Sequence, residues 1–215
     1  MATLYVSDMY TLFNANKMAA IPYFGPRRMG YGLAGSVLMD FAVLEKIEIT
    51  GNRINLIDTT PIGDNFLDGV LSYVSQLENN KKIKYYIRNI LKKGNYIYQL
   101  YTQHLESLNY MKLSFNIKRF LPTITVDFVN NDLREKVFNN IREILLENKP
   151  LPDKSSWYVL SLLKATSSYE SIFGKKYKKQ VKSRMKEIIG NEPIGKSVRS
   201  VIREAETSPP TDSGD

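Results

Sequence analysis

Apolar residues recur at intervals of three and four along most of this 215-residue chain. That interval matches the period of an α-helix that buries one face. Glycine, asparagine and proline interrupt the pattern and separate its segments. The segments expected to be helices are 4–13, 33–46, 65–77, 82–92, 96–109, 131–147, 155–166, 175–189 and 194–205. The sequence therefore predicts a mainly α fold, in which the almost wholly apolar segment 33–46 is a buried helix.

Two short stretches break the helical spacing and predict β-hairpins. Residues 47–56 alternate apolar and polar side chains around a Gly-Asn dipeptide, which favours a tight turn. Residues 110–122 are interpreted as a second short hairpin. No internal repeat divides the chain, so we expect one compact helical domain over residues 1–205. Residues 206–215 hold no core side chains and are expected to form a disordered tail.

Charge and composition narrow the classes of function. The formal charge is +8 and the isoelectric point about 9.4, which favours an anionic partner: nucleic acid, a membrane surface or an acidic protein. The chain has no cysteine, which excludes a disulfide, a thiolate nucleophile and a Cys-based zinc site. No segment reaches the roughly 20 apolar residues of a transmembrane helix, and the N-terminus lacks the basic region of a signal peptide. We therefore expect a cytoplasmic protein that associates with membranes only peripherally.

His104 is the only histidine of the chain. A single histidine excludes a two-histidine metal motif within one chain and leaves a Ser-His triad only one possible base. No serine or aspartate stands at a matching spacing, and the sequence has no nucleophile-elbow, P-loop or HExxH motif. We interpret His104 as a structural or surface side chain. The sequence thus predicts no catalytic residue, no metal site and no cofactor.

Three carboxylates surround a turn in the stretch NLIDTTPIGDNFLD. They could form a metal or acid/base site, or they could turn a strand into a helix. Asp64 directly precedes an apolar helical run, where a carboxylate accepts hydrogen bonds from unpaired backbone N–H groups. Asp68 lies in the first turn, where negative charge suits the helix dipole, and Asp58 stands before Thr-Thr-Pro, a usual place for an Asx turn. With Pro61 and Gly63 supplying the turn, we assign all five residues a structural role.

The stretch GYGLAG matches the G-x-G-x-x-G pattern of dinucleotide-binding turns through Gly30, Gly32 and Gly35. That fingerprint needs a strand directly before it, and the preceding PYFGPRRM is not a strand, so we reject a dinucleotide site. A glycine-rich turn at the start of a helix still offers backbone N–H groups to an anion. Arg27 and Arg28 stand beside it, which makes this loop a candidate anion site. The alternative is an ordinary loop with solvated arginines.

Two runs of basic residues, 81–93 and 174–186, hold six and seven cations and no acid. Apolar residues recur within both runs at helical spacing, so each run predicts an amphipathic helix with a basic face. Such a face is often merely solvated. Two of them in one domain favour an anionic surface as the partner.

Further stretches of the chain, GLAGSVLMDFAVLEKIEI and DTTPIGDNFLDGVL, resemble the Golgi phosphoprotein 3 family. Its members have a Gly-Leu-x-Gly turn into a buried helix, then a short strand, then a turn that begins the next helix with PTGD-x-x-LD. The stretches YQLYTQHLESLNYMKL, SWYVLSLLKATS and IGKSVRSVIRE are similar to later helices, and Pro122 matches a proline after the family's hairpin. The resemblance covers about residues 4–205 and is specific over 32–71. The sequence does not show the long acidic N-terminal extension of eukaryotic members, so we expect a prokaryotic-type member of the family.

The resemblance implies a compact, mainly helical fold without enzyme activity. Eukaryotic members bind phosphatidylinositol 4-phosphate on Golgi membranes and the cytosolic tails of resident glycosyltransferases. Their headgroup pocket uses a tryptophan after the first helix, an arginine within Gly-Leu-Arg-Gly and two basic residues before the hairpin. This chain has Ala34 in the arginine's place, Phe24 or Gly25 near the tryptophan's place, and Asn95 and Tyr98 near the other two. We therefore expect looser, electrostatic binding of anionic lipids.

Two functions fit these observations. The first is a non-catalytic peripheral membrane adaptor that binds anionic or phosphorylated headgroups and cytosolic protein tails, with homo-oligomers forming through hairpin 110–122. The alternative is a nucleic-acid-binding module in which helix 96–109 and the following hairpin act as helix and wing, and tyrosines and cations contact the strand. The residues assigned to lipid or anion binding are Tyr23, Phe24, Arg27, Arg28, Arg88, Lys92, Lys93 and Tyr98.

Overall fold

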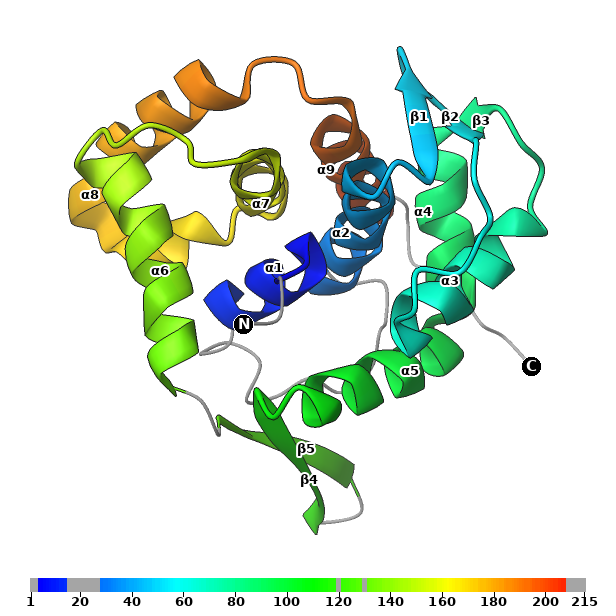
Figure 1. Ribbon diagram of the computed structural model, residues 1–215. Coiled ribbons are helices and arrows are strands. Elements are labelled where there is room, and N and C mark those ends of the chain that lie inside the picture. The colour runs from blue at the N-terminus through cyan, green and yellow to red at the C-terminus, as the bar shows by residue number, and fades with distance from the viewer. Residues whose placement is uncertain (1–3, 15–27, 119–120, 129–130, 208–215) are drawn as a thin grey trace.

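A computed structural model gives the fold of the protein (Figure 1). It describes residues 4–14, 28–118, 121–128 and 131–207. The helices are α1 (Val6–Asn14), α2 (Arg28–Val43), α3 (Asn65–Ser75), α4 (Ile83–Lys92), α5 (Gly94–Ser107), α6 (Asn131–Leu146), α7 (Lys154–Thr166), α8 (Tyr169–Ile189) and α9 (Pro193–Thr207). The strands are β1 (Ile47–Thr50), β2 (Arg53–Leu56), β3 (Lys81–Lys82), β4 (Met111–Lys118) and β5 (Leu121–Phe128). The mainly α fold that the apolar spacing predicts is confirmed.

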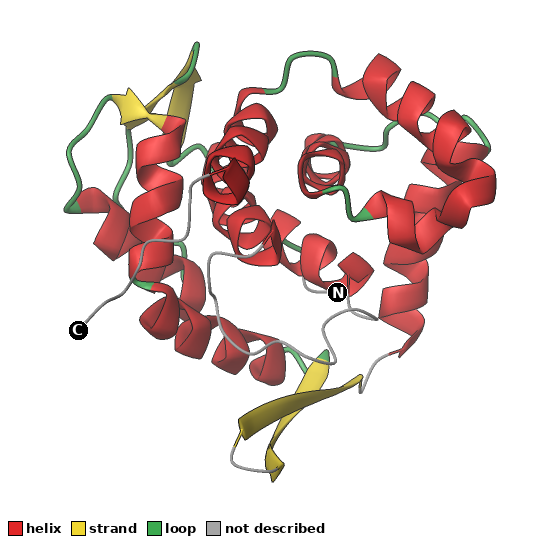
Figure 2. Ribbon diagram, turned by 180° about the vertical axis from the view of Figure 1, so that it is seen from behind, coloured by secondary structure: helices red, strands yellow, loops and turns green. Residues whose placement is uncertain are grey.

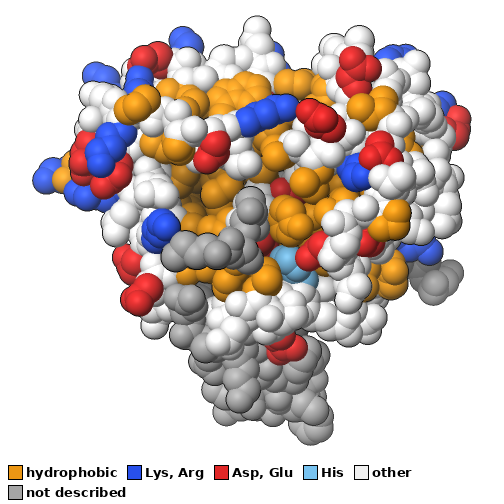
Figure 3. All heavy atoms as spheres, viewed as in Figure 1, with side chains coloured by type: hydrophobic (Ala, Val, Ile, Leu, Met, Phe, Trp, Pro, Cys, Tyr) orange, Lys and Arg blue, Asp and Glu red, His pale blue; other side chains and the backbone are white. Residues whose placement is uncertain are grey.

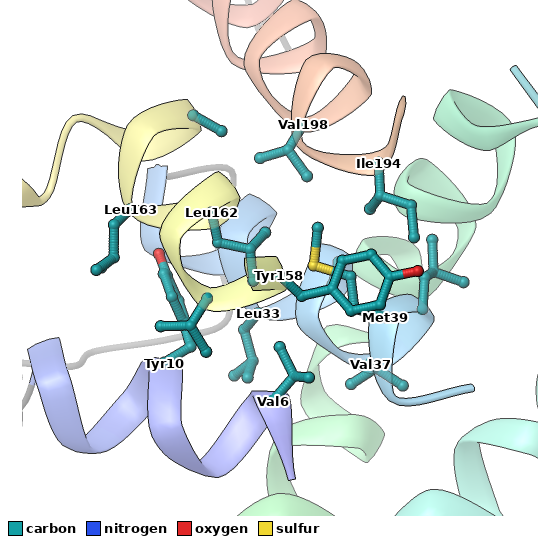
Figure 4. Close-up of a cluster of buried hydrophobic side chains, with 14 of the residues drawn as sticks. Val6, Tyr10, Leu33, Val37, Met39, Tyr158, Leu162, Leu163, Ile194 and Val198 are labelled. Atoms are coloured by element: carbon teal, nitrogen blue, oxygen red, sulfur yellow. The ribbon is translucent and has the colours of Figure 1, made fainter. Parts of the chain in front are cut away.

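Helix α2 runs through the core and packs against α1, α4, α7 and α9. Every residue from Gly30 to Ala42 is buried, as expected for a helix that is apolar on all sides and must be surrounded by others. Figure 4 shows side chains of four helices meeting around it. They are Val6 and Tyr10 of α1, Leu33, Val37 and Met39 of α2, Tyr158, Leu162 and Leu163 of α7, and Ile194 and Val198 of α9.

The prediction of a glycine-rich turn before α2 is wrong, because α2 already begins at Arg28 and includes Gly30, Gly32 and Gly35. Their role is close packing. A Cβ atom on Gly32 would lie 2.1 Å from the Tyr10 hydroxyl oxygen, and one on Gly35 would lie 2.5 Å from Cγ2 of Val198. The glycines let neighbouring helices approach α2, and this need outweighs the low helix propensity of glycine.

The first predicted hairpin is present, with β1 and β2 antiparallel and Thr50 opposite Arg53 next to the turn. A third strand that the sequence analysis missed, β3, pairs with β2, so the sheet order is β1-β2-β3. The start of the first basic run, Lys81 and Lys82, is therefore strand and not helix. β1 is an edge of this small sheet.

The second hairpin is longer than predicted. The predicted range 110–122 includes β4 but only the first two residues of β5, which continues to Phe128. Pro122 lies within β5 opposite Ile117, and not after the hairpin as the family resemblance implied. A proline lacks the N–H that a ladder uses, but it is tolerated near the start of a strand. The two sheets lie at opposite ends of the molecule (Figure 2).

Several helix boundaries differ from the expected ones, by as much as six residues at the start of α8. Helix α5 begins at Gly94, directly after α4. Helix α8 begins at Tyr169 and bends at Gly174, whose φ of 69° is outside the helical region. Helix α9 reaches Thr207, so the first two residues of the predicted tail are helical, and 208–215 lie outside the described residues. Within the described ranges, no helix is long and apolar enough to span a bilayer.

Candidate functional site

The turn between β2 and α3 is held by its three carboxylates. Asp58 accepts a hydrogen bond from the Thr60 backbone N–H at 2.8 Å and pairs with the Lys46 ammonium group. The hydrogen bond from Lys46, followed by those from Thr60, lowers the pKa of Asp58 to about 2. Asp68 accepts from the N–H groups of Ile62 and Gly63 at 2.6 and 3.0 Å. Asp68 thus fixes the turn from inside the helix, which the dipole argument alone did not predict.

Asp64 occupies the N-cap of α3. Its Oδ1 accepts from the Leu67 N–H at 2.9 Å, and its backbone is extended, as a cap residue requires. Its other oxygen, Oδ2, lies 2.9 Å from Nδ1 of His104. The cap is therefore joined to helix α5, a contact that no sequence spacing indicated.

His104 joins three helices inside the protein. Its Nε2 lies 2.9 Å from Oδ1 of Asp8 on α1, while Nδ1 faces Asp64 at the start of α3. The Asp8 side chain is 0% exposed and the His104 side chain 3%. The rings of Phe66 and Tyr101 pack beside the imidazole. Because carboxylates only accept, both ring nitrogens donate and the imidazole is protonated.

The pKa values follow from this arrangement. Burial disfavours the imidazolium, but the hydrogen bonds to Asp64 and Asp8 outweigh it and raise the pKa of His104 to about 9. Burial likewise opposes the charge of Asp64, but the hydrogen bonds from His104 and the Leu67 N–H lower its pKa. A doubly bonded imidazolium has no free nitrogen with which to accept a proton. The cluster is therefore suited to holding helices together and not to general base catalysis.

A further buried carboxylate, Asp40 of α2, caps the start of α1 from a distance. It accepts from the N–H groups of Val6 and Ser7 at 2.5 and 3.1 Å. Burial raises its pKa to about 8. Sequence reasoning missed the roles of Asp8 and Asp40, although a lone acid within each apolar run was a usable signal. Across the described residues, no group of three or more His, Asp or Glu side chains is arranged to hold a metal ion.

We expect Asp64→Ala to lower the free energy of unfolding by about 0.5–2 kcal/mol through loss of the cap. The effect of losing the His104 contact adds to this. Asp64→Ser separates the two, because serine keeps a capping oxygen but is too short to reach the imidazole. Urea unfolding should rank the proteins as wild type, then Asp64→Ser, then Asp64→Ala. An Asp64→Ala protein as stable as wild type would show that the cap contributes nothing.

Of the residues predicted to bind anions, some lie outside the described residues and the others lie on α2, α4 and α5 or at the junction of α4 and α5. Tyr23, Phe24 and Arg27 lie outside the described residues, so the expected role of that loop stays a prediction. Arg28 and Arg88 are far apart in the sequence, but both pair with acids near the C-terminal end of α9. Arg28 pairs with Glu206 at 2.7 Å and Arg88 pairs with Glu204, both at the end of α9.

Helix α4 supplies most of this surface. Its apolar residues Ile83, Tyr86, Ile87 and Ile90 are buried. Lys84, Arg88 and Lys92 recur every fourth residue and so form one stripe along the helix, and Lys84 pairs with Glu204 at 2.5 Å. We define the basic surface as Arg28, Lys84, Arg88, Lys92 and Lys93.

The stripe ends at an open pocket of about 250 Å³ where α4 meets α5. Lys92, Lys93 and Tyr96 line it, and Tyr96 is 48% exposed. The Lys93 ammonium group also lies 5.8 Å from the centre of the Tyr73 ring. Tyr98 is half-buried against the core, and burial raises its pKa. Tyr96, which the sequence analysis did not select, is thus the more accessible aromatic beside these lysines.

The second basic run lies elsewhere, on α8, which Figure 1 places across the molecule from α4. Its lysines Lys175, Lys179 and Lys182 are exposed, while Val181 and Met185 are buried. On the face drawn in Figure 3, hydrophobic side chains gather over the middle and charged ones lie mostly around them. The two basic runs therefore do not form one patch.

Comparison with known proteins identifies the family of the chain. No curated protein is similar to the chain at a significant level. The sequence profile of the family described as Golgi phosphoprotein 3 (GPP34) matches residues 8–205. The match spans the elements from α1 to α9, including the buried α2, the capped turn before α3 and the basic helix α4. The chain therefore belongs to the Golgi phosphoprotein 3 family.

Proposed function

We propose that this protein is a non-catalytic adaptor that attaches reversibly to anionic membrane surfaces through the basic surface. The observation that carries the proposal is the convergence of Arg28 from α2 with Lys84 and Arg88 from α4 around the end of α9. A cation near an anionic membrane contributes about 1 kcal/mol. Several cations beside an exposed tyrosine therefore suffice for reversible attachment.

Two features support a role without catalysis. The chain belongs to a family of non-enzymatic adaptors. Its only histidine is held by two carboxylates at 2.9 Å each and is shielded from solvent. Homo-oligomerisation through the second hairpin stays a prediction, as does a specific phosphorylated headgroup.

We expect Lys92→Gln with Lys93→Gln to weaken binding to vesicles of phosphatidylcholine and phosphatidylserine, by about fivefold for each lysine. Co-sedimentation at several salt concentrations measures this, and binding should fall steeply as salt rises. The matched control is Lys179→Gln with Lys182→Gln on α8, which removes the same charge from the other basic helix. Equal losses in both double variants would mean that net charge alone drives binding. A wild-type protein that ignores these vesicles at low salt but binds duplex DNA would favour the nucleic-acid alternative.

Glu204→Gln with Glu206→Gln should have the opposite effect. These two acids pair with Arg28, Lys84 and Arg88, so their neutralisation makes the three cations available to lipid phosphates. We expect tighter vesicle binding with unchanged helical content by circular dichroism. Binding that stays the same or weakens would place the contact surface away from the end of α9.

A further inference from the structure

The second basic run, which the adaptor role leaves unused, forms a stripe of cations on α8. Val181 and Met185 of this helix are buried, so the opposite face is turned to solvent. Four of its exposed lysines follow one another at intervals of three and four residues, which places them on one face of the helix. They are Lys175, Lys179, Lys182 and Lys186. At a rise of about 1.5 Å per residue, the stripe is about 16 Å long.

Helix α7 lies between α8 and α9 in Figure 1 and in Figure 2, and it packs against both. The Trp157 indole N–H donates to the Ile188 carbonyl at 3.2 Å, which joins α7 to α8. On the other side, a Cβ atom on Gly195 of α9 would lie 2.1 Å from the Ser161 hydroxyl oxygen of α7. The three helices therefore form one layer, to whose surface each can contribute side chains.

Cations of α7 and α9 extend the stripe. Lys164 stands in the last turn of α7, and Lys196 and Arg199 are exposed on α9. Burial lowers the pKa of Lys164, and the nearby charges of Arg199, Lys186 and Lys196 lower it further. These four cations from three helices are therefore neighbours. We define the α8 surface as Lys164, Lys175, Lys179, Lys182, Lys186, Lys196 and Arg199.

The acids near this surface are engaged elsewhere. Glu170 and Glu187 pair with Lys178 and Arg184, which are not part of it. Glu192 is 1% exposed and is turned inward, where it accepts hydrogen bonds from backbone N–H groups at the start of α9. Within the described ranges, no cation of the α8 surface forms an ion pair. Like charges gathered in this way repel one another, and an anion that binds among them relieves the repulsion.

The chemistry of the α8 surface fits the phosphate backbone of a nucleic acid duplex. One strand of a duplex carries a phosphate about every 3.4 Å along the axis, so about five phosphates lie beside a stripe of about 16 Å. Lysine ammonium groups hold phosphates as point charges and lack the rigid fork with which arginine reads guanine. Tyr177 is only partly exposed, and the Lys176 ammonium group lies 5.1 Å from the centre of its ring. The surface thus offers little on which unpaired bases could stack, which favours a duplex over a single strand.

We propose that the α8 surface binds duplex nucleic acid through its phosphate backbone, without reading the base sequence. The lysines of α8 make the central contacts, and Lys164, Lys196 and Arg199 contact phosphates beside them. The isoelectric point of about 9.4 and the clustering of cations along one helix are typical of such proteins. This activity goes beyond the adaptor role and uses neither the basic surface nor the second hairpin, so the two proposals can fail separately.

Fluorescence anisotropy of a short labelled DNA duplex, titrated with the full chain at several salt concentrations, tests the proposal. Each phosphate contact contributes about 0.9 to the slope of log affinity against log salt concentration. We expect Lys179→Gln with Lys182→Gln to reduce this slope by about 1.8 and to weaken binding at about 0.1 M salt by about tenfold for each lysine. The matched control is Lys92→Gln with Lys93→Gln on α4, which removes the same charge and should keep the wild-type slope.

The two double variants exchange roles between this assay and the vesicle assay, which separates the two surfaces. Equal losses of duplex binding in both would mean that net charge alone attracts the duplex, and this would overturn the proposal. An absence of duplex binding by the wild type at low salt would overturn it as well.

Two further measurements identify the partner and the extent of the surface. Arg199→Gln should reduce the slope by about 0.9, and an unchanged slope would contradict the contact assigned to α9. Two duplexes of unrelated sequence should bind equally, and a strong preference for one would contradict backbone recognition. A polyglutamate peptide that displaces the labelled duplex better than an unlabelled duplex of equal charge would assign the surface to an acidic protein and overturn the proposal.

Discussion

His104→Ala is expected to lower the free energy of unfolding by about 3–5 kcal/mol, the range for breaking a buried ion pair from one side. The substitution leaves the Asp8 carboxylate buried without its partner and leaves Asp64 without the contact to α5. It also removes a ring that packs against Phe66 and Tyr101. Urea unfolding followed by circular dichroism measures the loss. Gln103→Ala, at the exposed neighbouring position of the same helix, is the control and should change little.

The pH dependence gives a second, independent measurement. A pKa raised from 6.5 to about 9 in the folded state means that the folded protein holds the proton more tightly than the unfolded chain. The stability from this group is then fully present below about pH 6.5 and is lost as the pH rises to about 9. Wild type should lose stability over that window and His104→Ala should lose less. Parallel pH profiles for the two proteins would mean that His104 is not protonated in the folded state.

Gly35→Val should destabilise the protein by about 3 kcal/mol, near the upper end for overpacking a core. A Cβ atom at this position lies 2.5 Å from Cγ2 of Val198 and 3.0 Å from Cδ2 of Leu162. Both neighbours are 0% exposed and cannot move aside without disturbing α7 and α9. Gly35→Ala should cost less than Gly35→Val, because it introduces a smaller volume and gains about 1 kcal/mol of helix propensity.

Gly69→Ala is the matched control, since it also adds a methyl group to a glycine within a helix. Its Cβ would meet Cδ1 of Leu100 at 2.4 Å, the end of a flexible and only partly buried side chain that can turn away. We expect Gly69→Ala to be neutral or to stabilise by up to about 1 kcal/mol. Thermal unfolding of the three variants tests the order. A Gly35→Val protein that melts like wild type would show that α7 and α9 adjust without cost.

Local patterns predicted most helices well because these helices bury one face, and that face is visible as apolar spacing in the sequence. The start of α2 was misplaced for a physical reason. Glycines usually mark turns, but Gly32 and Gly35 lie inside α2, where the absence of a side chain leaves room for Tyr10 and Val198. Those two neighbours belong to other helices, so local spacing does not reveal them. β3 was missed because its two lysines follow no apolar alternation and are ordered by pairing with β2.

The candidate sites were less predictable than the fold. The capping role of Asp64 was readable from its place before an apolar run, but its contact with His104 depends on how α3 and α5 pack. The pairing of Arg28 with Glu206 and of Arg88 with Glu204 was not readable from the sequence. Contacts between residues more than a hundred positions apart leave no trace in local spacing, so single-sequence reasoning cannot supply them.

The central place of α2 has a consequence for biosynthesis. Domains tend to fold as units while the chain is synthesised from its N-terminus, yet α2 packs against α7 and α9, which are made near the end. The part of its apolar surface that α7 and α9 cover is therefore exposed on the ribosome until translation is almost complete. Contacts of such long sequence separation also slow folding, because the chain must lose loop-closure entropy before these contacts can form. A nascent chain stalled before Pro193 should thus be a substrate for chaperones and proteases, while the released full-length protein is not.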